Sequence, residues 1–95
     1  MESGKNGMKI AKGFVLSNVG NEHVVMAIGA ASMKLNGMIR LNASGVEMWN
    51  MLKEGAEEEE LAAALVKEYG ITAERARQDV GAFLAILRPV GCIEE

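Results

Sequence analysis

The chain has 95 residues and a mass of 10.2 kDa, which is enough for one small domain with a single hydrophobic core. Its 49% hydrophobic and 24% charged residues are typical of a globular protein and exclude a disordered one. A single Cys and a single His exclude an intrachain disulfide and a multi-cysteine or two-histidine metal site, and 4% aromatic residues are too few for a platform that stacks single-stranded nucleic acid.

The net charge of −3 is unevenly distributed along the chain. Residues 1–42 carry five basic and two acidic side chains, whereas residues 43–95 carry five basic and eleven acidic ones. This acidic second half argues against a surface that follows nucleic-acid phosphates. The longest uncharged run, His23 to Met33, has eleven residues, fewer than the roughly 20 that a membrane helix needs. Because the N-terminal MESGKNG also lacks the apolar core of a signal peptide, we expect a cytoplasmic protein without membrane association.

The first twelve residues are polar and show no hydrophobic period, so we predict a flexible tail over 1–12 and one domain over 13–95. Phe14–Val19 and His23–Ile28 are rich in β-branched and large apolar residues. The Gly20–Asn21 pair between them tolerates the positive φ of a tight turn and predicts a β-hairpin. A loop of small residues over 29–36 then leads to a short third strand, Met38–Leu41.

Three helices are predicted after the strands. Asn42 is a suitable N-cap for a helix that ends at Gly55. Apolar spacing predicts a second helix over 57–69, and Thr72 caps a third helix that stops at Pro89. Because the strands precede the helices instead of alternating with them, the fold class is α+β, with a three-stranded antiparallel sheet followed by three helices.

The residues that most often carry chemistry do not form a catalytic pattern. His23 is next to the hairpin turn, Cys92 has no C-x-x-C partner, and 57–60 is a glutamate run that complements a helix dipole. The eleven glycines form no phosphate-binding motif. The third strand is more informative, because an edge strand presents unpaired N–H and C=O groups to which another chain can add.

Residues 36–52, NGMIRLNASGVEMWNML, resemble the central signature of the PqqD family, the pyrroloquinoline quinone synthesis protein D-like proteins. The G-F-V-L strand at 13–16, the K-E-G-A-x-x-E-E-L stretch at 53–61 and the Y-G-I turn at 69–71 follow in the order expected for such proteins. One departure is Glu57, at a position where we expect a Ser or Thr cap.

The resemblance implies a winged helix-turn-helix-like fold and a non-catalytic role without cofactor or metal. Such proteins bind the leader segment of a ribosomally made precursor peptide and present it to a modifying enzyme, often a radical S-adenosylmethionine (SAM) enzyme. The leader adds as an antiparallel strand to the third strand, in a groove completed by the third helix. Carried over by position, the peptide-binding residues are Met38, Ile39, Arg40, Leu41, Arg75, Asp79, Ala82, Phe83 and Ile86.

Two other functions compete with peptide capture. The helices also permit a winged-helix DNA-binding regulator, although the charge distribution opposes it and we expect no nucleic-acid partner. Alternatively, the edge strand pairs with its own copy and forms a homodimer.

Overall fold

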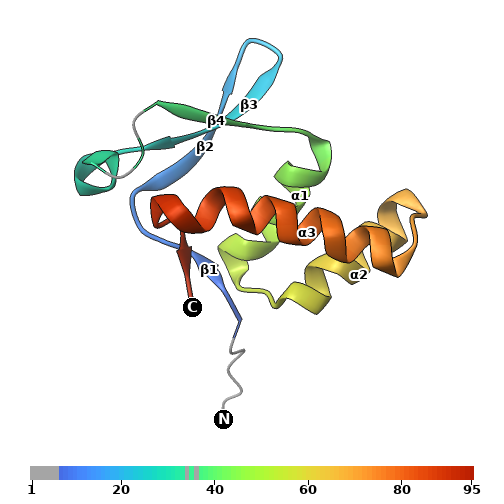
Figure 1. Cartoon of the computed structure of the whole chain (residues 1–95). Helices are drawn as coiled ribbons and strands as arrows, with labels where there is room; N and C mark the ends of the chain where they lie inside the picture. Colours follow the sequence, from blue (N-terminus) through green and yellow to red (C-terminus); the bar gives the residue numbers. More distant parts are fainter. Residues whose placement is uncertain (1–6, 34, 36) are drawn as a thin grey trace.

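The computed structural model describes residues 7–33, 35 and 37–95. A three-stranded sheet lies on one side of a layer of three helices, and a second, two-stranded sheet lies near the two ends of the described chain (Figure 1). The predicted α+β class, with an antiparallel sheet followed by three helices, is confirmed.

The larger sheet has the order β2-β3-β4, formed by β2 (Phe14–Val19), β3 (Glu22–Ala27) and β4 (Met38–Leu41). Both neighbouring pairs are antiparallel. The predicted two-residue turn is present, since Val19 pairs with Glu22 and Gly20 has a φ of +63°. Between β3 and β4 the expected loop contains the 3-10 helix η1 (Gly29–Met33), while Lys34 and Asn36 lie outside the described residues.

The three helices begin and end where local signals place them. In α1 (Ala43–Glu54) the Asn42 side chain accepts a hydrogen bond from the Gly45 N–H at 2.9 Å. Thr72 caps α3 (Ala73–Leu87) in the same way through the Arg75 N–H at 3.0 Å. In α2 (Glu58–Tyr69) the N-cap is Glu57, whose backbone N–H donates to Oε1 of Glu60 at 2.9 Å. The glutamate run therefore caps the helix without a Ser or Thr.

The segment before β2 pairs with the rest of the fold in the structure, whereas the sequence predicts a flexible tail over residues 1–12. The strand β1 (Lys9–Ile10) pairs antiparallel with β5 (Ile93–Glu94), which follows the 3-10 helix η2 (Arg88–Val90). Met8 forms a bridge with Ala56 and is only 6% exposed. The prediction of a tail rests on polarity, whereas in the structure Met8 and Ile10 both pack on the core. Residues 1–6 lie outside the described part of the chain.

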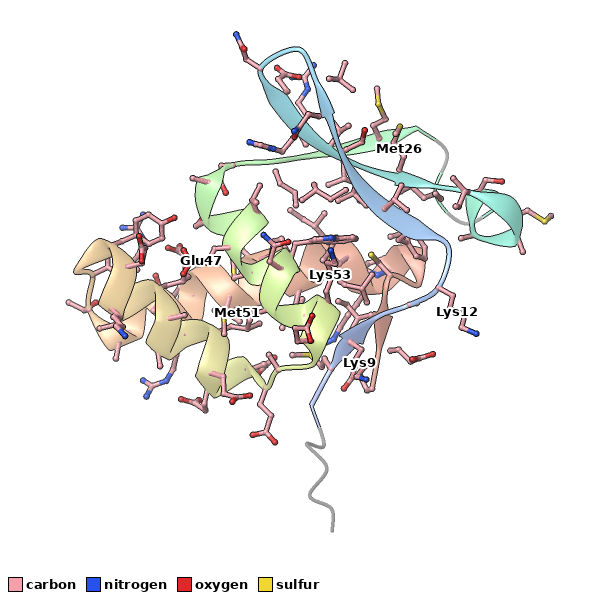
Figure 2. The ribbon with its side chains drawn as sticks, turned by 180° about the vertical axis from the view of Figure 1, so that it is seen from behind. Lys9, Lys12, Met26, Glu47, Met51 and Lys53 are labelled. Atoms are coloured by element: carbon pink, nitrogen blue, oxygen red, sulfur yellow. The ribbon has the colours of Figure 1, made fainter. Side chains whose placement is uncertain are left out.

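The core lies between the three-stranded sheet and the helices. Trp49 and Leu52 of α1, Leu61 and Leu65 of α2, and Leu84 of α3 are almost completely buried. Seen from behind, α1 runs from the end of β4 across the other helices, with Glu47, Met51 and Lys53 labelled along it (Figure 2). Because α1 follows β4 with only Asn42 between them, the position of β4 is fixed by the helical core.

Candidate functional site

The candidate site begins with the outer side of β4, which is an edge of the larger sheet. The Ile28 N–H donates to the Gly13 carbonyl at 2.7 Å. Because backbone groups alternate in direction along a strand, every second residue of β3, counted back from Ile28, also directs its N–H and C=O toward β2. The residues between them, His23 and Val25, therefore face β4, opposite Leu41 and Ile39. It follows that the backbone N–H and C=O groups of Met38 and Arg40 point away from β3, in the plane of the sheet and beyond its edge.

A groove of about 780 Å³ lies between this strand and α3. That volume is within the range of roughly 300–1,000 Å³ that is usual for ligand pockets. Eight of the nine residues predicted for peptide binding line the groove: Ile39, Arg40, Leu41, Arg75, Asp79, Ala82, Phe83 and Ile86. The ninth, Met38, is not part of this lining and is 58% exposed.

The floor and one wall of the groove are apolar. Ile39 and Leu41 are half-buried and pack on the core, and Phe83 and Leu87 of α3 are buried. Ile86 is 55% exposed although it is a large aliphatic residue. An exposed Ile beside a half-buried strand leaves apolar surface that a ligand side chain would remove from water.

The charged groups of the groove lie in pairs at its rim. Arg75 Nε is 3.2 Å from Oδ1 of Asp79, one turn further along α3. Arg40 Nε is 3.1 Å from Oε1 of Glu22 across the sheet. Both pairs are exposed to solvent, so each contributes little to folding and remains available to a ligand. His23, also in the lining, is held by Asn18 through its Nδ1 at 2.7 Å.

The sequence does not predict the part of the groove formed by the hairpin turn, by α1 with its N-cap, and by the last residue of α3. These residues are Asn21, Glu22, His23, Asn42, Ala43, Ser44, Gly45, Met48 and, from α3, Leu87. Asn42 was recognised only as a helix cap. The signal that could have found them is the direct passage from β4 into α1, which places the first helical turn beside the edge strand.

Cys92 does not line this groove. Cys92 is fully buried in the core, and burial raises the pKa of its thiol to about 12, so it is a neutral thiol at pH 7. Within residues 7–33, 35 and 37–95, no three His, Cys, Asp or Glu side chains come together as a metal site. What the groove offers is backbone donors and acceptors beside apolar surface.

A second hollow of about 440 Å³ lies between α1 and the start of α2. Its lining includes Glu47 and Met51, both labelled in Figure 2. No described strand edge borders this hollow, so the groove beside β4 is the candidate site.

These features define a small α+β module with an open strand edge beside a helix-walled groove. A family model matches residues 22–93, and the chain belongs to the PqqD family, described as coenzyme PQQ synthesis protein D. The match covers β3, β4, all three α-helices and the first residue of β5.

Two solved structures share the fold. One is TbiB1 in complex with the TbiA(beta) leader peptide, which is 26% identical, has a TM-score of 0.72 and aligns over 90% of this chain and 94% of that chain. The other is lasso peptide synthetase B1 complexed with the leader peptide, at 17% identity and a TM-score of 0.73, over 94% of this chain and 99% of that chain. No curated protein sequence matches the chain. None of the helices in the described part of the chain is both long and apolar enough to span a membrane.

Proposed function

We propose that this protein captures the leader segment of a ribosomally made precursor peptide and presents it to a modifying enzyme, such as a radical SAM enzyme. The observation that carries the proposal is the outward-facing backbone of Met38 and Arg40 beside an open apolar groove. An extended peptide that adds antiparallel to β4 gains main-chain hydrogen bonds from the strand, and every second side chain enters the groove.

The solved structures support this proposal. Both are complexes with leader peptides, and both align with nine-tenths or more of this chain. TbiB1 in particular combines 26% sequence identity with a leader peptide in its structure. The peptide class proposed for this chain is therefore the one that these similar proteins bind.

The role we assign to the chain is non-catalytic. The described lining of the groove contains no cysteine, and its Arg and carboxylate side chains lie in exposed ion pairs. Binding alone accelerates the modification, because a leader held close to the enzyme raises the effective concentration of the attached core peptide.

The charges on α3 favour peptide capture over DNA binding. Arg75 lies 3.2 Å from Asp79, and Arg77 lies 3.6 Å from Glu59. A recognition helix for DNA needs basic side chains directed at phosphates and base edges, whereas the carboxylate beside each of these guanidinium groups would repel a phosphate.

The test is an NMR titration of the labelled protein with synthetic peptides translated from short open reading frames that adjoin its gene. We expect shifts to cluster on residues 38–42 and along α3. Arg40→Pro removes an N–H donor that faces outward, so it leaves the sheet intact while weakening binding by about tenfold or more. Arg40→Ala is the matched control, because it removes the side chain and keeps the N–H donor. Unchanged affinity in a folded Arg40→Pro variant, or shifts confined to other surfaces, would overturn the proposal.

A further inference from the structure

The outer face of the larger sheet, opposite the helices, carries an exposed apolar row. The helices lie on the other side of the sheet (Figure 1). Val15, Met26 and Met38 are aligned across the three strands by their pairing, and Val15 and Met38 are both exposed. This row ends at the free edge of the sheet, because Met38 belongs to β4.

The neighbouring row on the same face ends with a charge. Ser17, Val24 and Arg40 are aligned across the strands, and the Arg40 side chain is 77% exposed. Its Nε contacts Glu22 at 3.1 Å. A guanidinium group has five N–H donors in a planar fork, so one contact through Nε leaves other N–H groups able to donate to a second carboxylate.

A fourth strand added to β4 would continue both rows. Its residues opposite Met38 and Arg40 form the hydrogen bonds, because those two residues have the outward-facing backbone groups. Side chains opposite each other in a pair lie on the same face of the sheet. The two hydrogen-bonded ligand residues therefore lie on the outer face, and the ligand residue between them, opposite Ile39, enters the groove.

We propose that the sheet recognises its peptide on both faces, as an acidic residue followed by two apolar residues. This inference rests on the proposed function. In an antiparallel strand the acidic residue lies opposite Arg40, the first apolar residue lies in the groove opposite Ile39, and the second lies opposite Met38 at the end of the exposed row. Met38, which does not line the groove, thereby becomes a specificity residue on the outer face.

The experiment selects a phage-displayed library of random twelve-residue peptides on the full chain. The wild type is expected to enrich the order acidic, apolar, apolar. On Arg40→Glu the first position is expected to change to Lys or Arg, while the two apolar positions remain. The matched control is Arg77→Glu, an exposed arginine outside the groove lining, which keeps the wild-type pattern.

Synthetic versions of the enriched peptides give the size of the effect by fluorescence polarisation. Replacing the acidic residue by Lys should weaken binding to the wild type by about two- to fivefold, the usual size of an exposed cross-strand charge pair, and should strengthen binding to Arg40→Glu. Both effects shrink at high salt, because the pair is exposed.

Two outcomes count against different claims. Suppose that the wild type and Arg40→Glu enrich peptides with the same residue at the position expected to be acidic, and that the two apolar residues persist. The recognition of an acidic residue by Arg40 is then refuted, while strand addition stands. If Arg40→Pro, folded, enriches the same peptides as the wild type with equal affinity, strand addition to β4 is refuted and this inference with it.

Discussion

Replacing Met8 by Ala distinguishes an ordered segment before β2 from a flexible one. The side chain of Met8 is buried, and its backbone forms two hydrogen bonds with Ala56, of 2.8 and 3.0 Å. Nη2 of Arg88 also lies 3.4 Å from the Met8 sulfur. The substitution keeps the backbone bonds and removes only the buried thioether and its methylene groups.

The expected cost follows from the burial of the side chain. Truncation of a buried Met to Ala destabilises proteins by about 2–5 kcal/mol, and a segment near the end of a chain can move inward to fill part of the space, so we expect about 2–3 kcal/mol. For a domain of this size that lowers Tm by roughly 8–24 °C. Total stabilities are only about 5–15 kcal/mol, so the loss is a large fraction of the whole.

The assay is urea denaturation and thermal melting followed by circular dichroism. The matched control is Met33→Ala, the same substitution at a side chain that is 89% exposed, where we expect a change within about 0.5 kcal/mol. If the two variants are equally stable, Met8 does not contribute to the core and the packing described for residues 8–12 is wrong.

Three further predictions concern the core, a turn and the groove. Burial raises the Cys92 pKa from 9.0 to about 12, so the stability gained from its neutral thiol is complete below pH 9 and is lost as the pH rises toward 12. Between about pH 8 and 10.5 the wild type should therefore lose more stability in urea melts than Cys92→Ala, and equal slopes would contradict this. Gly13→Ala should cost about 2–4 kcal/mol, because Gly13 has a φ of +94° and an added Cβ lies 2.7 Å from that of Ala31. Gly20→Ala, with a φ of +63° and no atom within 4 Å of the added Cβ, should cost only about 1 kcal/mol, and similar losses for the two would refute the steric argument. Ile86→Ser should weaken binding of the precursor peptide by about fivefold without changing the melting temperature, whereas the neighbouring Ala85→Ser, outside the groove, should leave affinity unchanged.

Local signals explain which elements were predictable from the sequence. Gly20–Asn21 indicates a two-residue hairpin, while Asn42 and Thr72 are side chains that satisfy the free amides of a first helical turn. Each of these features is encoded within a few residues. The helices and the larger sheet therefore formed where expected.

The β1–β5 pair was not predictable in the same way. Lys9–Ile10 and Ile93–Glu94 are two-residue strands, too short to show an alternating pattern, and they come from distant parts of the sequence. What stabilises this segment is the burial of Met8 against the helical core, which is a tertiary effect. Polarity alone made residues 1–12 look like a tail.

The groove was predicted in part, for a related reason. Residues of β4 and α3 were carried over by position, and the structure brings eight of the nine together. The backbone register was beyond sequence analysis, because it depends on which β3 residues bond to β2. That register selects Arg40, and not Ile39, as the position where a proline would remove an outward-facing donor.

The single residue between β4 and α1 has a thermodynamic consequence. Asn42 ends the strand and caps the helix, so β4 is joined without a loop to the helix that carries Trp49 and Leu52. A ligand that pairs with β4 then binds only the folded domain, and occupancy raises the unfolding temperature of the whole chain. At one hundred times Kd this linkage amounts to about 2.7 kcal/mol, or roughly 10–20 °C in Tm. Thermal melting of the unlabelled protein can therefore rank candidate peptides directly.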